Sequence, residues 1–318
     1  MNYDVFNGDA DGLCALVQLR RAEPRDATLV TGVKRDIALL EQVYAESGDS
    51  VTVLDISLDK NRASLQRLLT AGAKVFYCDH HFAGDIPASP QLEALINTSA
   101  DVCTSLLVNG HLRGAYAAWA VTGAFGDNLR DSAARLAKGL DLSASQLQSL
   151  ENLGIYINYN GYGPSLEDLH FAPADLYKLL ALHDDPFTFM EAERSHFERL
   201  ETGYRQDMAA AAALEPLYRT PAAAVYRLPD AAWARRVSGV FGNDLANQDP
   251  ARAHAVVTER EDGDYLVSVR APLNNKTGAD ELCREFPTGG GRAAAAGINA
   301  LPAGQLQAFV DRIAAFYA

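Results

Sequence analysis

The first hundred residues alternate short apolar runs with longer segments of helical periodicity, and this alternation leaves few folds open. The expected strands are 3–6, 28–33, 51–54, 75–78 and 94–96, and the expected helices between them are 12–21, 36–46 and 60–71. Strands separated by helices of this length form βαβ units, with parallel strands and right-handed crossovers. In such open sheets, ligands bind beyond the carboxyl ends of the strands. The polar residues that directly follow each strand are therefore the first candidates for a functional site.

The rest of the chain predicts a second domain. A chain of 318 residues is about twice the usual size of a domain. Helical patterns dominate from about 104 to 205, and the helical segment 187–213 ends before Pro216 and Pro221. After it we expect strands at 222–226, 253–258 and 265–270, helices at 237–246, 278–284 and 304–317, and a glycine-rich turn before the last helix. The prediction is an α/β protein with a parallel-sheet domain over 1–190, a helical linker over 191–215 and a smaller mixed α/β domain over 216–318.

The distribution of charge limits the partners. The formal net charge is −13, and residues 1–215 carry 17 Lys and Arg against 30 Asp and Glu, whereas residues 216–318 carry 11 of each. Binding of long nucleic acid depends on many contacts between Lys or Arg and phosphate. We therefore expect no long duplex DNA, and only short single-stranded oligonucleotides or nucleotide phosphates if nucleic acid is bound at all. Taken alone, the acidity also fits a surface that only keeps the protein in solution.

The sequence also bears on location. No stretch approaches the roughly 18 consecutive apolar residues of a membrane span, and the first residues lack the basic start and apolar run of a secretory signal. The four cysteines are widely spaced without a CxxC pair, which favours neither a zinc knuckle nor a disulfide framework. We expect a cytoplasmic protein without a membrane partner, and the sequence is compatible with a homodimer.

Two carboxylates follow the first strand. Residues 3–6 run directly into Asn7-Gly8-Asp9-Ala10-Asp11-Gly12. Asp9 and Asp11, one residue apart on a tight turn, can both face one cation, and the flanking glycines allow the backbone to turn sharply. An acidic turn that caps the following helix explains the same residues equally well.

Further candidates follow two more strands. Asp55 comes after strand 51–54, and Asp79-His80-His81 ends strand 75–78. Each alone has a structural explanation, such as helix capping. Together, however, three turns bring carboxylates and imidazole to one edge of the sheet. This ligand set suits Mn²⁺, Mg²⁺, Fe²⁺ or Zn²⁺, and its many oxygens favour Mn²⁺ or Mg²⁺.

In order and spacing these motifs resemble those of the DHH phosphoesterase superfamily, which is named after the tripeptide found here as Asp79-His80-His81. The segment 7–12 resembles the first motif, Asp55 the second and Gly126-Asp127-Asn128 the fourth. The segment 289–297, a glycine run followed by Arg292 and an Ala-Ala-Gly, resembles the DHH-associated domain. The superfamily includes RecJ-type exonucleases, nanoRNases, cyclic-dinucleotide phosphodiesterases and family II pyrophosphatases.

The resemblance implies a metal-dependent phosphoesterase that hydrolyses short oligonucleotides or nucleotide phosphates in a cleft between the two domains. It implies one or two Mn²⁺ ions, or Mg²⁺, held by Asp9, Asp11, Asp55, His80 and Asp127. His81 would protonate the leaving oxygen or hold a phosphoryl oxygen, and Asp79 would orient a histidine. The implied substrate-binding residues are Gly289, Gly290, Gly291, Arg292, Arg270 and Ser268. Successive glycine N–H groups form an anion site, and a helix start after them would add to it.

Three positions depart from the family pattern. Many relatives have a histidine where this chain has Val5, and RecJ-type exonucleases have an aspartate where it has Asn7. Asn7 would be an extra metal or substrate contact, but a neutral amide is a weaker ligand than a carboxylate, so one metal position is expected to be weak or absent. Arg292 stands where a histidine is usual, which predicts a substrate with a terminal or multiply charged phosphate. These departures keep open a nucleotide sensor without activity, beside cyclic-dinucleotide and pyrophosphatase-type hydrolases.

One further segment, 154–163, is rich in tyrosine. Exposed tyrosines there would stack on nucleic-acid bases. Packing between the domains explains the segment better.

Overall fold

A computed structural model describes all residues from 1 to 318, which divide into two units, Met1–Glu201 and Thr202–Ala318. The division falls inside helix α9 (Arg194–Ala212), within the segment for which the sequence predicts a helical linker. The expected helix over 187–213 is in fact two helices, α8 (Pro186–Ala192) and α9, separated at Glu193. None of the helices has both the length and the apolar character that a membrane crossing requires.

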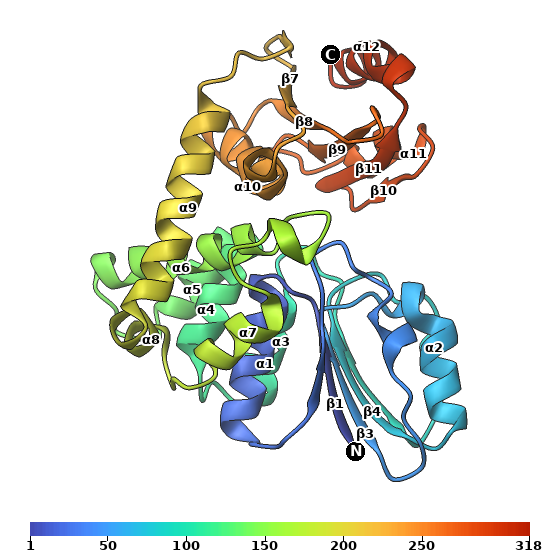
Figure 1. Ribbon diagram of the computed structural model, residues 1–318, viewed down its shortest axis with the longest axis vertical. Coiled ribbons are helices and arrows are strands. Elements are labelled where there is room, and N and C mark those ends of the chain that lie inside the picture. Colours follow the sequence, from blue (N-terminus) through green and yellow to red (C-terminus); the bar gives the residue numbers. More distant parts are fainter. The chain divides into compact units, whose positions relative to one another are not determined.

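The first unit contains a five-stranded sheet in which every pair of neighbours is parallel (Figure 1), as predicted. The order is β2-β1-β3-β4-β5. The strands are β1 (Asn2–Phe6), β2 (Thr28–Val30), β3 (Ser50–Leu54), β4 (Lys74–Asp79) and β5 (Leu92–Ile96). Strand β2 ends three residues before the expected boundary, so residues 31–34 belong to the loop at the carboxyl end of the sheet.

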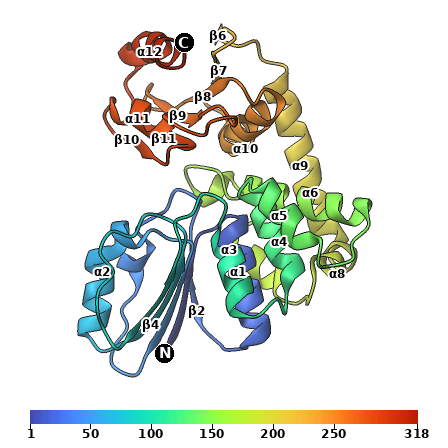
Figure 2. The same ribbon diagram turned by 180° about the vertical axis from the view of Figure 1, so that it is seen from behind.

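Helices cover both faces of this sheet (Figures 1 and 2). Helix α2 (Leu58–Thr70) lies on one face, where Leu65 and Leu68 join Val5 and Val53 in one buried core. Helices α1 (Ala10–Ala22) and α3 (Thr104–His111) lie on the other face. The remaining helices of this unit are α4 (Ala117–Gly126), α5 (Arg130–Ala137), α6 (Ala144–Asn160), α7 (Pro173–Leu180) and α8. The helices expected at 12–21 and 60–71 are therefore confirmed as α1 and α2, within two residues of the expected bounds.

The helix predicted over 36–46 is wrong. Only Leu39–Gln42 forms a single 3₁₀ turn there. Side chains of α2 take the backbone partners that a helix would use: Asn61 accepts from the N–H of Leu40, and Arg67 donates to the carbonyls of Leu40 and Val43. Leu39, Leu40 and Val43 are buried in the α2 core. Burial of these apolar residues, combined with side-chain hydrogen bonds, outweighs the helical periodicity.

The second unit contains a six-stranded mixed sheet of order β10-β11-β9-β8-β7-β6, in which only β7 and β8 are parallel neighbours. Its strands are β6 (Tyr218–Arg219), β7 (Ala223–Leu228), β8 (Ala253–Glu259), β9 (Tyr265–Arg270), β10 (Gly289–Gly291) and β11 (Ala295–Leu301). Its helices are α10 (Ala232–Gln248), α11 (Ala279–Arg284) and α12 (Leu306–Phe316). The mixed α/β character is as predicted.

The glycine run is not the expected turn before a helix. Gly289–Gly291 is the edge strand β10, and a tight turn from Arg292 to Ala295 leads into strand β11. The expected contribution of a helix start to an anion site is therefore wrong.

Candidate metal centre

The predicted metal ligands come from loops at the carboxyl ends of the parallel strands. Asp9 and Asp11 follow β1, Asp55 follows β3 and His80 follows β4. Asp127 comes instead from the end of α4. A Cβ on Gly126 would lie 2.3 Å from the Cβ of Ala10, so glycine at this position allows α4 to pack against the start of α1.

His80 lies at the centre of the cluster. Its Nδ1 is 2.9 Å from the carbonyl oxygen of Val102, which can only accept, so Nδ1 carries the proton. Nε2 therefore faces the carboxylates, as a metal-ligating nitrogen must. It lies 3.3 Å from Asp55 Oδ1, 3.8 Å from Asp11 Oδ2 and 3.9 Å from Asp127 Oδ2.

These distances fit a single ion. Two ligand atoms that each lie about 2.1 Å from one ion are separated by roughly 3.0 Å at a right angle and by about 4.2 Å when opposite. All three separations from His80 Nε2 lie within that range. Three carboxylates and one imidazole are donors that suit Mn²⁺ or Mg²⁺. Judged by their distances from His80 Nε2, the residues present thus fit one divalent ion.

Asp55 is under electrostatic stress that a cation would relieve. Its side chain is buried, and burial together with the charges of Asp9 and Asp11 raises its pKa well above the usual value. Its backbone has φ = +59°, a left-handed conformation that aspartate and asparagine tolerate better than most residues. Unfavourable backbone geometry of this kind is concentrated at functional sites.

Asp11 is fixed by the start of helix α3. Its Oδ1 accepts from the N–H of Ser105 and its Oδ2 from the N–H of Thr104, both at 2.7 Å. The hydroxyl of Thr104 donates to Asp55 Oδ1 at 3.3 Å. The first turn of α3 therefore orients two of the carboxylates beside His80.

His81 forms a pair with Asp79. Its Nδ1 is 2.7 Å from Asp79 Oδ1, so the histidine that Asp79 orients is His81 and not His80. Burial lowers the pKa of His81, but the hydrogen bond and the charge of Asp79 outweigh it and raise the pKa. Asp55, His80 and His81 each offer a ligand atom, and these atoms lie within 4.8 Å of one another. Because Nδ1 is bound to Asp79, His81 has Nε2 left to donate to a phosphoryl or leaving oxygen.

Asp9 lies beside the cluster but is bound differently, by a residue that the sequence did not single out. Its Oδ2 forms an ion pair with Lys34 Nζ, which also donates to Asn158 Oδ1 at 3.0 Å. Burial raises the pKa of Asp9, but Lys34 outweighs it and lowers the pKa to about 2. Lys34 directly follows the strand expected at 28–33, but the search was for metal ligands, and lysine is not one.

Comparisons with known proteins concern the fold. No protein-family model matches the sequence, and a search of curated proteins finds no similar sequence. Among solved structures, the exonuclease RecJ bound to manganese is 20% identical over 99% of this chain and 89% of its own, with a TM-score of 0.61. The DHH domain of a member of the s1p family of ribosomal proteins is 13% identical, covering 99% of this chain and 86% of its own, with a TM-score of 0.64.

A third structure matches over its whole length. The pGpG-specific phosphodiesterase from Vibrio cholerae is 16% identical, covers 99% of both chains and has a TM-score of 0.58. The chain has the fold of the DHH proteins. At these identities the likeness concerns the fold, and the roles of the residues in the DHH motifs are inferred from their geometry.

Asn7, in the first DHH motif, supports the loop that carries Lys34. Its Nδ2 donates to the carbonyl of Lys34 at 3.3 Å, and its Oδ1 is buried without a hydrogen-bond partner. Its role as a metal or substrate contact remains a prediction.

The tyrosines of segment 154–163 are not stacking platforms. Tyr156, Tyr159 and Tyr162 are all buried, and the hydroxyl of Tyr159 pairs with His170 Nε2 at 2.8 Å. The expectation that exposed tyrosines of this segment stack on bases is therefore wrong.

In the second unit the predicted substrate-binding residues lie on strands β10 and β9, which are separated by β11, and on the turn after β10. Arg270 is half-buried and its guanidinium is already engaged. It donates to Asn243 Oδ1 at 2.6 Å, to Ser268 Oγ at 2.9 Å and to the carbonyl of Gly239 at 3.3 Å. Arg292 is exposed on the turn after β10. Of the two arginines, Arg292 is the more accessible to a substrate.

Within the glycine run, the backbone explains two of the three residues. A Cβ on Gly289 would lie 1.7 Å from the carbonyl oxygen of Cys283, and Gly291 has φ = +142° with the Cα of Ala296 2.5 Å from its ideal Cβ. Both positions require glycine for packing of the hairpin. At Gly290 a Cβ would meet nothing within 4 Å, so packing gives no reason for glycine there.

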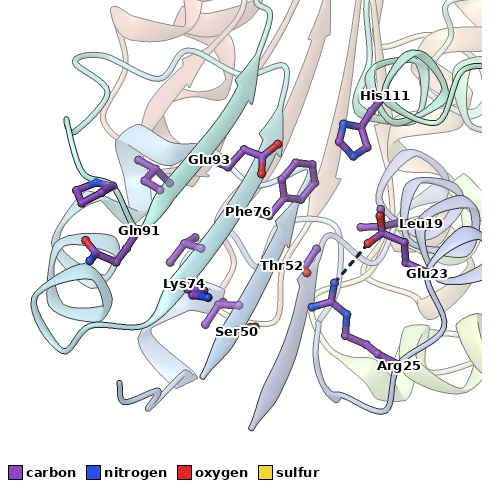
Figure 3. A pocket seen from close by; sticks show the side chains of 14 residues that line it. Leu19, Glu23, Arg25, Ser50, Thr52, Lys74, Phe76, Gln91, Glu93 and His111 are labelled. Carbon is purple, nitrogen blue, oxygen red and sulfur yellow. Dashed lines mark ion pairs between the residues drawn. The ribbon is translucent and has the colours of Figure 1, made fainter. Parts of the chain in front are cut away.

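A separate cavity of about 510 Å³ lies at the other end of the parallel sheet (Figure 3). Ser50, Lys74 and Leu92, which line it, are the first residues of β3, β4 and β5. Figure 3 shows Phe76 and His111 side by side at this cavity, with the ion pair of Arg25 and Glu23 close by. None of the predicted site residues lines it.

Proposed function

We propose that the protein is a divalent-metal-dependent phosphoesterase that hydrolyses phosphoester bonds of short oligonucleotides or nucleotide phosphates. The observation that carries the proposal is the position of His80 Nε2, between 3.3 and 3.9 Å from oxygens of three carboxylates. A divalent ion bound there would polarise a phosphoryl oxygen and lower the pKa of water to near neutrality. Mn²⁺ is the preferred ion, with Mg²⁺ as the alternative.

The residues around the ion site suit attack on a phosphate ester. Asp79 holds the imidazole of His81 by Nδ1, and the raised pKa of His81 favours the protonated ring. A proton on Nε2 can then be donated to a phosphoryl oxygen or to the leaving oxygen of the ester. Arg292 and the N–H of Gly290 are the proposed contacts for substrate phosphate, since forked arginine donors and glycine N–H groups suit anions.

Two observations support a short substrate. The net charge of −13 disfavours a long polyphosphate chain. The pGpG-specific phosphodiesterase, whose substrate is short, matches this chain over 99% of both lengths. Cyclic-dinucleotide and pyrophosphatase-type hydrolysis remain the alternatives within the same chemistry.

A substrate panel tests the proposal. The full chain is freed of metal with a chelator, supplied with Mn²⁺ or Mg²⁺, and given a 5′-phosphorylated dinucleotide, a nucleoside 3′,5′-bisphosphate, a cyclic dinucleotide and pyrophosphate. We expect metal-dependent release of mononucleotide or phosphate from one of the first two compounds. Turnover of only the cyclic dinucleotide or of pyrophosphate would select one of the alternatives. Tight nucleotide binding by the metal-loaded protein without hydrolysis would contradict an enzyme and favour a sensor.

A further inference from the structure

Asp9 has both carboxylate oxygens occupied by groups of the protein. Oδ1 accepts from the N–H of Asp11 at 3.0 Å and from the N–H of Gly12 at 3.1 Å, and thereby caps helix α1. Oδ2 is bound to Lys34 Nζ. A metal ion bound to Asp9 would have to lie beside the positive charge of this ammonium group. Asp11, Asp55 and Asp127, in contrast, each present an oxygen toward His80 Nε2.

Lys34 is held in place through both its backbone and its ammonium group. The N–H of Lys34 donates to the carbonyl of Gly161 at 2.8 Å, and its own carbonyl accepts from Asn7. Nζ donates to Asn158 and lies 5.4 Å from the centre of the Tyr162 ring. These partners come from the first motif and from the end of α6. The lysine is thus part of a built site and is not a flexible surface side chain.

The loops around Lys34 pack closely against one another. A Cβ on Gly8 would lie 2.0 Å from the carbonyl oxygen of Gly32, and a Cβ on Gly161 would lie 3.1 Å from the Cα of Asp9. The three segments that meet here therefore touch through their backbones. Val5, four residues before Asp9, is buried in the apolar core on the α2 side and offers no ligand atom.

We infer that the Lys34 ammonium group takes the place of a second divalent cation beside Asp9, so that the centre holds one metal ion, bound by Asp11, Asp55, His80 and Asp127. The inference rests on the proposed function for the presence of that one ion. It assigns Asp9 to the ion pair and to the cap of α1, and it explains how this chain accommodates Asn7 and Val5 without two strong metal positions.

Counting bound metal tests the inference directly. Native mass spectrometry and calorimetric titration of the metal-free full chain with Mn²⁺ measure the number of ions per chain without any substrate. One ion per chain is expected. Two ions at saturation would overturn the inference and leave the proposed function intact. No bound ion would remove the proposed function, and the inference with it.

A pair of matched variants gives an independent readout. Asp9→Asn keeps a side chain that caps a helix but loses the charge, and Asp127→Asn makes the same change on the other side of the cluster. The dissociation constant of Mn²⁺ should rise by less than about tenfold in Asp9→Asn and by more than about a hundredfold in Asp127→Asn, since the second change removes a ligand. Equal losses in the two variants would identify Asp9 as a ligand and overturn the inference.

Thermal unfolding of metal-free protein tests the ion pair itself. Asp9→Asn and Lys34→Met should each lower the unfolding midpoint, and the double variant should lose less than the sum of the two single losses, because the pair is broken only once. Additive losses would show that the two side chains do not interact and would overturn the inference. Should Lys34→Met not fold, Lys34→Gln replaces it.

Discussion

The polar side chains at the candidate metal centre of the first unit and those around Arg270 in the second unit are arranged differently. In Met1–Glu201, carboxylates and a histidine face one another at the carboxyl ends of parallel strands. Burial, together with the like charges of Asp9 and Asp11, raises the pKa of Asp55. In Thr202–Ala318, the polar side chains around Arg270 bond to one another, as in the contacts of Arg270 with Ser268 and Asn243. Like-charged side chains that converge on one imidazole indicate a bound cation, whereas a guanidinium bonded to neutral neighbours indicates a structural role.

The largest effect is expected at Asp55. Asp55→Asn should lower activity by roughly a thousandfold, because the several kcal/mol that a bound ion supplies depend on this central carboxylate. The fold should persist, since asparagine tolerates the left-handed backbone. Steady-state rates and circular dichroism measure the two outcomes. Asp141, an exposed aspartate with φ = +50°, gives the matched control Asp141→Asn, and equal rates in both variants would exclude the centre.

Variants of the two adjacent histidines should show that one binds the metal and the other acts in catalysis. His80→Ala is expected to weaken Mn²⁺ binding by about a hundredfold or more, because it removes a ligand nitrogen. His81→Ala should keep the metal and lose about a hundredfold in kcat, the usual size of a contribution from a proton donor. Metal analysis after dialysis, together with kinetics, distinguishes them. Metal loss in His81→Ala with full occupancy in His80→Ala would reverse the assignment.

The stability of the second unit should depend on pH through His254 on β8. Burial, helped by the charge of Arg252, lowers the pKa of His254 from 6.5 to about 4. Between these values the unfolded chain binds a proton that the folded chain does not, so stability falls as the pH falls, by about 2 kcal/mol from pH 7 to pH 5.

Denaturant unfolding of the wild type and of His254→Gln at both pH values checks this expectation. The first unit is the same in the two proteins, so the difference between them isolates His254. A difference that does not change with pH would contradict the lowered pKa.

The smallest effect is expected at Arg292. Arg292→Ala should raise KM by about tenfold with a smaller change in kcat if the guanidinium binds ground-state phosphate. Arg284→Ala, on an exposed arginine of α11, is the control. An unchanged KM in Arg292→Ala would place the phosphate contact elsewhere and would make the second unit's glycine hairpin purely structural.

Much of the fold could be predicted because its signals are local. Alternating apolar runs gave the parallel sheet, and the ends of β1, β3 and β4 marked Asp9, Asp55 and His80. The segment 36–46 was mispredicted because its backbone is satisfied by Asn61 and Arg67 from another element, which periodicity does not reveal. The glycine run was mispredicted because a strand and a turn share its composition.

The different roles of the residues in the cluster could not be predicted either. The sequence presents Asp9 and Asp11 as equivalent, and only the loop after β2 distinguishes them by placing Lys34 on Asp9. Lysine is not a metal ligand, so the search for ligands passed over it. Conversely, which histidine Asp79 orients depends on a 2.7 Å contact with His81 that spacing alone does not determine.

The central claim is that His80 and three carboxylates bind one divalent ion. Anomalous diffraction from a crystal soaked in Mn²⁺ tests it most directly. We expect one strong peak about 2.2 Å from His80 Nε2 and from oxygens of Asp11, Asp55 and Asp127, with Lys34 still bound to Asp9. No peak at this position, or a peak bound elsewhere in the chain, would contradict the account.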